Sequence, residues 1–83
     1  MVDGQDVPTP THRLDVIGYA CPVPVAKTKE ALSTLSDGHV LEVLADDPET
    51  FHDLPLVIGR ARHRLVHVGE NDGEFRFVIE VVT

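Results

Sequence analysis

The segment that decides the fold lies between residues 14 and 24 and reads Leu14-Asp15-Val16-Ile17-Gly18-Tyr19-Ala20-Cys21-Pro22-Val23-Pro24. Leu14 and Val16 alternate with polar neighbours, which predicts a short strand over residues 13–17. Gly18 ends this strand. Cys21 is therefore expected in a turn between this strand and the next element.

A helix is predicted directly after the cysteine, from Pro22 to about Leu35. Its apolar side recurs at spacings of three and four residues and comprises Pro24, Thr28, Ala31, Leu32 and Leu35. Proline suits the first helical turn because its ring fixes φ and because the N–H groups there have no intrahelical acceptor. Asp37-Gly38 is expected to end the helix.

Three further strands are predicted downstream. Val40 to Ala45 is apolar on both faces except at Glu42, which indicates a central place in a sheet. A strand at residues 64–68 and a turn at residues 71–73 follow. Alternating apolar residues then predict a last strand, which carries Phe75, Phe77, Ile79 and Val81. The last two strands should form a hairpin, because the turn reads Asn-Asp-Gly.

A second helix is predicted within residues 50–62, and its start is open. Thr50 with Asp53 resembles a capping pair, whereas Pro55 disfavours helix at the residue before it and would delay the start. The expected order is strand, helix, strand, helix, strand, strand. The economical packing for this order is an α/β two-layer sandwich, with two helices on one face of a four-stranded mixed sheet.

The composition excludes several classes of protein. Fourteen acidic residues against seven basic ones give a formal net charge of −7, so direct nucleic-acid binding is not expected; the one basic cluster is at residues 60–64. No stretch approaches the roughly 18–20 apolar residues that span a bilayer, so no membrane association is expected. Residues 1–11 are predicted to be a disordered leader and residues 12–83 a single domain.

Cys21 is the single cysteine of the chain. An internal disulfide and a four-cysteine metal site are therefore excluded, and a free thiol is typical of the cytoplasm. A lone cysteine in a small domain is more often an inert core residue, but a turn between a strand and a helix is exposed and favours function. The positive end of the helix dipole and the charges of Lys27 and Lys29 should stabilise the thiolate. They therefore predict a lowered pKa for the Cys21 thiol.

The other polar residues predict no second site. His63 and His67 are four residues apart on a strand, which is about 13 Å and too far to share an ion. The five histidines are read as surface residues, and neither a metal nor a cofactor is expected. Asp46-Asp47-Pro48 is predicted to be a turn that ends a strand, with solvated charges.

Residues 14–24 match the pattern L-D-x-x-G-x-x-C-P-x-P, and so resemble the TusA/SirA-like family of sulfur carriers. Residues 44–50 and 53–55 resemble the second block of that family, and the likeness runs from about residue 12 to residue 82. The resemblance implies a sandwich of βαβαββ order, similar to the C-terminal domain of translation initiation factor three. It also implies that Cys21 accepts a sulfane sulfur, holds it as a persulfide and passes it on.

The resemblance further implies partners and supporting residues. The donor would be a cysteine desulfurase or a rhodanese-like protein, and the acceptor would serve tRNA thiolation, molybdenum-cofactor assembly or sulfur metabolism. Residues expected to shape the site are Gly18, Tyr19, Pro22, Pro24 and Asp47. Lys27 and Lys29 are expected to bind the partner. The carrier itself is expected to be a cytoplasmic monomer.

Two other functions stay open. A protein-binding or regulatory module of the same fold would do no sulfur chemistry, and a thiol pKa at or above the free value would favour it. A thiol-dependent redox enzyme is disfavoured, because no resolving cysteine or general-base histidine lies near Cys21 in the sequence. The prediction is therefore a sulfurtransferase-type persulfide carrier rather than a complete turnover enzyme.

Overall fold

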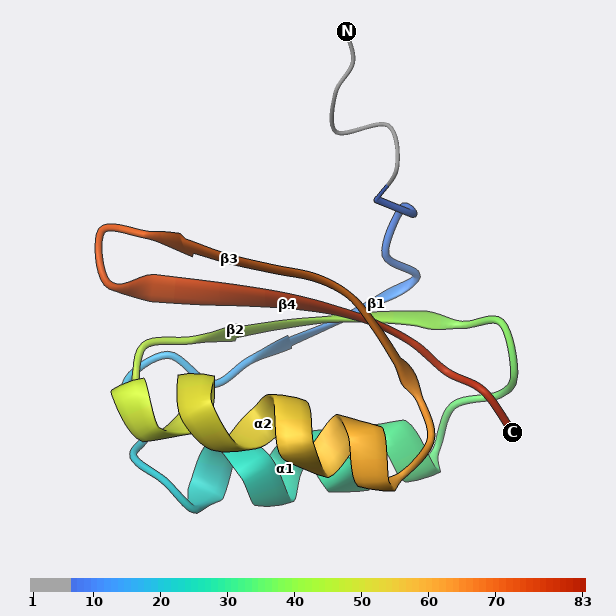
Figure 1. Cartoon of the computed structure of the whole chain (residues 1–83), viewed down its shortest axis with the longest axis horizontal. Coiled ribbons are helices and arrows are strands. Elements are labelled where there is room, and N and C mark those ends of the chain that lie inside the picture. The colour runs from blue at the N-terminus through green and yellow to red at the C-terminus, as the bar shows by residue number, and fades with distance from the viewer. Residues whose placement is uncertain (1–6) are drawn as a thin grey trace, which may run out of the picture.

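The computed structural model describes residues 7–83, and these form one sheet and two helices. In chain order the elements are β1 (His12–Asp15), α1 (Val23–Ser33), β2 (Val40–Ala45), α2 (Pro48–Arg60), β3 (Arg64–Asn71) and β4 (Glu74–Glu80). The strands lie in the order β1-β2-β4-β3, and both helices cover one face of the sheet (Figure 1). The predicted α/β two-layer sandwich with a mixed four-stranded sheet is confirmed.

The parallel pairing of β1 with β2 decides which loops meet. Asp15 pairs with Leu44, so the two strands end at the same edge of the sheet. Each strand is followed by a helix that returns across the same face. Figure 1 shows α1 and α2 side by side with both starts at one end of the molecule. The loop that carries the cysteine therefore lies against the start of α2.

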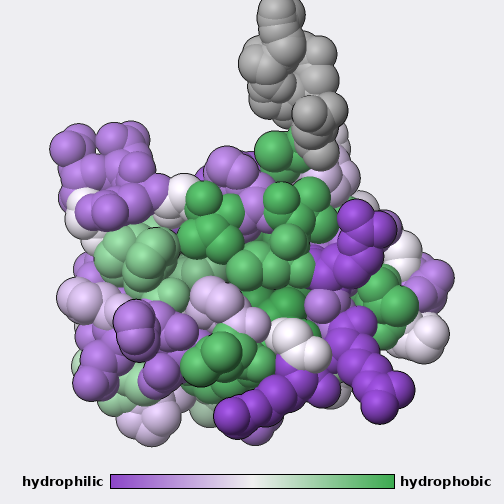
Figure 2. Space-filling view, viewed as in Figure 1, coloured by the Kyte–Doolittle hydropathy of each residue, from purple (hydrophilic) through white to green (hydrophobic). Residues whose placement is uncertain are grey.

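The core fills the space between the sheet and the helices. Alternate residues of the two central strands are buried there, namely Leu41, Val43 and Ala45 of β2 and Phe75, Phe77 and Ile79 of β4. Leu32 of α1 and Leu54 and Ile58 of α2 close the core from the other side. Each large side chain buried in this way contributes roughly 1.5–3 kcal/mol. Figure 2 shows hydrophobic side chains gathered along the seam between the sheet and α2.

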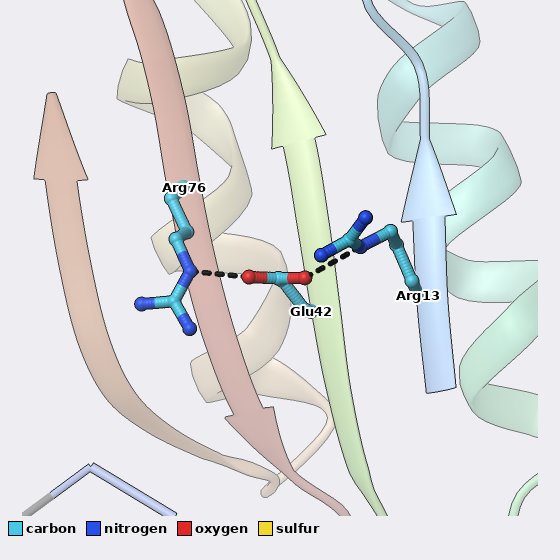
Figure 3. A network of polar contacts seen from close by, with 3 residues as sticks. All are labelled: Arg13, Glu42 and Arg76. Carbon is cyan, nitrogen blue, oxygen red and sulfur yellow. Dashed lines mark hydrogen bonds and ion pairs between the residues drawn. The ribbon is translucent and has the colours of Figure 1, made fainter. Parts of the chain in front are cut away.

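The opposite face of the sheet carries a buried acid. Glu42 of β2 is 5% exposed and accepts a hydrogen bond from Arg13 Nε of β1 at 2.7 Å. Arg76 of β4 donates to the other oxygen (Figure 3). The Arg76 bond, and after it the Arg13 bond, hold the pKa of Glu42 below its usual range although burial opposes them. The two arginines thus supply hydrogen bonds and opposite charge to Glu42, the one charged residue of β2.

The helices differ in their bounds from the predictions. α1 begins at Val23 and ends at Ser33, before the predicted Asp37-Gly38 stop. α2 begins at Pro48, so both predicted starts are wrong. Asp47 caps this helix by accepting a hydrogen bond from the Thr50 N–H at 3.1 Å, and a proline at the first helical position needs no acceptor.

Pro55 lies inside α2 rather than at its start. It removes one helical hydrogen bond, which costs free energy. Leu54 and Ile58 lie on one side of the helix and are fully buried, so core packing holds the helix together across the proline. These tertiary contacts outweigh the local preference against helix at the residue before a proline.

The strands follow the predicted pattern with shifted ends. β1 covers residues 12–15 rather than 13–17, and β3 continues to Asn71. Asp72 and Gly73 have φ values of 53° and 82°, the positive φ that a two-residue hairpin turn requires. The predicted hairpin is confirmed, and β2 has its predicted bounds and central position.

Residues 1–6 of the predicted leader lie outside the described residues. Thr11, the last residue of that leader, joins the sheet through Val40 of β2. The Thr11 N–H donates to the Val40 carbonyl at 2.8 Å, and the Val40 N–H donates to the Thr11 hydroxyl at 2.9 Å. The paired region of the chain therefore starts one residue before β1.

Candidate functional site

The cysteine loop is fastened to the junction between β2 and α2. Gly18 has a φ of 90°, a conformation that glycine adopts without strain, and its N–H donates to Asp46 Oδ1 at 2.9 Å. The Tyr19 N–H donates back to the Val16 carbonyl at 3.2 Å. These bonds turn the chain sharply after β1 and direct it toward α2.

Asp47 joins the cysteine to the second helix. Its Oδ2 accepts hydrogen bonds from the Cys21 N–H at 3.3 Å, the Thr50 N–H at 3.1 Å and the Thr50 hydroxyl at 3.2 Å. Thr50 is fully buried, so its hydroxyl depends on this acceptor. One carboxylate therefore caps α2 and positions the backbone of Cys21.

The start of α1 offers few free amides to the sulfur. Pro22 is the N-cap residue and Pro24 lies in the first turn, and neither has an N–H group. The N–H of Val23 donates to the Ala20 carbonyl at 3.1 Å. Most of the donors that make a helix start attractive to anions are therefore absent or already used.

Carboxylates surround the thiol instead. Cys21 is half-buried, and its Sγ lies 3.8 Å from Asp53 Oδ2. Asp47 and Glu49 place carboxylate oxygens within 4.8 Å of the sulfur and of each other. Burial first, and then the charges of Asp53, Glu49 and Asp47, raise the pKa of the Cys21 thiol above its ordinary value. The predicted lowering of this pKa is wrong, because burial and these acids all favour the protonated thiol.

Of the other residues expected at the site, some lie beside the thiol and others lie away from it. Tyr19 is 49% exposed beside the loop, and Pro22 lines a hollow together with the thiol, whereas Pro24 is buried in the core. Lys29 is exposed on α1 and lines a second hollow, further along the helices. Lys27 is exposed and lines neither hollow. The lysines are thus not gathered at the sulfur.

Three side chains at the site have ligand atoms suited to a cation. In residues 7–83 the group of Cys21, Asp47 and Glu49 is the one cluster of this kind. It supplies one sulfur and two carboxylates at an open surface, fewer ligands than the four that close a structural zinc site. Asp47 is also engaged as the cap of α2.

Sequence reasoning left three residues out of the site. Glu49, Asp53 and Leu56 lie on α2, and Asp53 and Leu56 line the hollow that contains the thiol. Leu56 is 59% exposed and adds an apolar side chain to this hollow. Spacings of four and three residues place them on one side of α2, but the helix predicted within residues 50–62 left Glu49 outside.

The comparison with protein families agrees with this geometry. The sequence model of the family described as "Sulfurtransferase TusA" matches residues 12–81. The chain belongs to the TusA family. The cysteine loop, the start of α2 and the β-hairpin all lie within the matched residues, so TusA membership covers the whole candidate site.

Relatives of the TusA family support the same assignment. A protein of Archaeoglobus fulgidus named "Putative sulfur carrier protein" is 35% identical over 71 residues, covering 84% of this chain and 92% of that protein. The Escherichia coli K12 protein named "Putative sulfur carrier protein YedF" is 31% identical, covering 86% and 92%. The crystal structure of a SirA-like protein from Desulfitobacterium hafniense matches with a TM-score of 0.77 at 27% identity, over 87% of this chain and 99% of that chain. The predicted TusA/SirA-like assignment is confirmed.

The helices also bear on membrane association. Within residues 7–83 neither α1 nor α2 has the length and apolar character that crossing a bilayer requires.

Proposed function

We propose that this chain is a sulfur carrier that accepts a sulfane sulfur on Cys21 and passes it to an acceptor protein. The observation that carries the proposal is the position of its sole thiol: Cys21 lies in the family motif, half-buried at the rim of an open hollow. Relatives over most of the chain are named as sulfur carriers. A thiol in this position is accessible to the sulfur of another protein.

The chemistry follows from thiolate exchange. The Cys21 thiolate attacks the outer sulfur of a persulfide on the donor. A new S–S bond forms at Cys21, the S–S bond of the donor breaks, and the donor cysteine leaves as a thiolate. No external oxidant or reductant is consumed, because the sulfane sulfur keeps its oxidation state. Repetition of the step with an acceptor thiolate returns Cys21 to its starting state.

The absence of a second cysteine suits a carrier. A neighbouring thiol would attack the Cys21 persulfide, form a disulfide and release sulfide. The 83-residue chain has one cysteine, so the sulfane sulfur on Cys21 can be transferred only to another molecule. A thiol stays free between cycles in a reducing compartment, and the proposal therefore places the protein in the cytoplasm.

Sulfur loading is the direct test. The full chain is incubated with a cysteine desulfurase and cysteine, or with a rhodanese and thiosulfate, and its intact mass is measured. We expect the mass of one sulfur atom to be added, to be removed by dithiothreitol, and to be absent in Cys21→Ser. A chain that gains no sulfur from either donor, although iodoacetamide alkylates Cys21, would contradict the proposal.

The raised pKa of Cys21 favours a second candidate, a protein-binding module of the same fold that does no sulfur chemistry. The two candidates differ in whether their function requires the Cys21 thiol. A carrier loses its cellular function in Cys21→Ser, whereas a binding module keeps it. Complementation of a deletion strain with the wild type and with Cys21→Ser separates them.

A further inference from the structure

Two hollows lie in a row between α1 and α2. The first, of about 330 Å³, contains Cys21 and Asp53, and the second, of about 340 Å³, contains Lys29 and His63. Val57 and Arg60 line both. The hollows are therefore parts of one continuous channel, which we term the helix groove.

Opposite charges stand at the two ends of the helix groove. The carboxylates of Asp47, Glu49 and Asp53 lie around the thiol end. At the other end Lys29 lines only the second hollow, and Arg60 lies where the two hollows meet. Asp53 and Arg60 are seven residues apart on α2, which corresponds to two helical turns or about 10 Å. Because α1 runs parallel to α2 and both helices begin at the acidic end, Lys29 of α1 also lies away from the carboxylates (Figure 1).

Apolar side chains line the helix groove along its length. Val25, Leu32 and Val57 line it, and Leu56 beside the thiol is 59% exposed. Among the residues that the structure describes, no ion pair involves Lys29 or Arg60. An apolar strip between unneutralised charges of opposite sign is typical of a surface that binds a protein segment in one direction.

We propose that the helix groove is the docking surface for the protein that loads Cys21 with sulfur. It fits a donor segment with a cationic side chain beside the sulfur-bearing cysteine and a carboxylate about 10 Å further along. This inference rests on the proposed sulfur-carrier function and adds to it the chemistry of the donor. A segment with the opposite order of charges would meet like charges at both ends of the groove.

Docking of such a donor also activates the thiol. In the free protein burial and the carboxylates around Cys21 favour its protonated form, which does not attack sulfur. A lysine or arginine of the donor placed among Asp47, Glu49 and Asp53 offsets their charge and favours the thiolate. The thiol is then reactive when a matching donor is bound and protected from other electrophiles when it is not.

The charge order is tested with two peptides of identical composition. Each has one cysteine, held in a mixed disulfide with 2-nitro-5-thiobenzoate, in an alanine-rich helical sequence. The matching peptide has lysines beside the cysteine and glutamates two turns away, and the reversed peptide has these positions exchanged. The Cys21 thiolate attacks the peptide sulfur, a peptide–Cys21 disulfide forms, and coloured nitrothiobenzoate leaves with the electrons of the broken S–S bond.

We expect the matching peptide to react about tenfold faster at low salt, and the ratio to fall toward one as salt screens the charges. Asp53→Lys should reduce the ratio, and Asp53→Lys combined with Lys29→Glu and Arg60→Glu should invert it. Glu30→Lys is the matched control, because it makes the same charge change on an exposed residue that lines neither hollow. Circular dichroism verifies the fold of each variant, and the rate with iodoacetamide normalises for the reactivity of the thiol.

The outcomes separate this inference from the proposed function. Equal rates for both peptides in the wild type, or equal effects of Asp53→Lys and Glu30→Lys, would overturn the charge-ordered groove even if a desulfurase loads Cys21. A clear preference for the matching peptide without sulfur loading from any donor would overturn the carrier function, and with it the sulfur donor as occupant. A preference that inverts in the triple variant, together with sulfur loading, supports both.

Discussion

Replacement of Asp47 tests whether one carboxylate both fastens the start of α2 and restrains the thiol. Asp47→Ala removes the acceptor of three hydrogen bonds, from the Cys21 N–H, the Thr50 N–H and the Thr50 hydroxyl. Asp47→Asn keeps an acceptor oxygen and removes only the negative charge. Comparison of the two variants separates hydrogen bonding from charge.

The expected cost to stability follows from these contacts. Loss of an N-cap side chain costs about 1 kcal/mol. Thr50 is fully buried, and a buried polar group without a partner costs about 1–3 kcal/mol. We therefore expect Asp47→Ala to lower the free energy of unfolding by about 2–3 kcal/mol, which corresponds to a fall in Tm of about 10–20 °C for a domain of this size. Asp47→Asn should cost less than about 1 kcal/mol, the value of a charge at a helix start.

Both substitutions should lower stability but raise the reactivity of the Cys21 thiol. The Asp47 charge raises the pKa of Cys21, so both variants should hold more thiolate at pH 7 and react faster with iodoacetamide. Thermal unfolding followed by circular dichroism and alkylation followed by mass spectrometry give the two readouts. Equal Tm values for the alanine and asparagine variants would refute the capping argument. A wild-type alkylation rate in Asp47→Asn would refute the electrostatic one.

Two further predictions concern pH. Asp53→Asn should shift the pH profile of Cys21 alkylation to lower pH, because it removes the carboxylate 3.8 Å from the sulfur; an unchanged profile, measured against Glu30→Gln as control, would contradict this. Glu42→Gln should destabilise the domain by about 1–2 kcal/mol near neutral pH, since hydrogen bonds to a charged group are lost. The pKa of Glu42 is depressed in the fold, so its contribution is present above the unfolded value of about 4.3 and is lost as pH falls toward the lower folded value. Urea unfolding from pH 7 to pH 3 should therefore show the two proteins converging in acid, and a constant difference would exclude an ionised Glu42 as the cause.

Much of the fold could be predicted because its signals are local. The alternation of Phe75, Phe77 and Ile79 marks β4, and the positive φ demanded after Asn71 marks the hairpin. The apolar run of β2 placed that strand at the centre of the sheet. The start of α2 was missed, because the sequence rules weigh Pro55 locally while the burial of Leu54 and Ile58 holds the helix through it.

The sequence by itself pointed to the candidate thiol and predicted the fold that holds it. A single cysteine inside a strand–turn–helix motif identifies the candidate thiol, and Gly18 supplies the positive φ of the turn before it. Only the tertiary structure decided the charges that this thiol experiences. The carboxylates of Asp47, Glu49 and Asp53 are 26 to 32 residues away in the chain, and they reach the sulfur because β1 and β2 pair in parallel and both helices start at one end. Burial and electrostatic effects depend on distance through space, so the sequence alone did not predict that burial and these acids raise the thiol pKa.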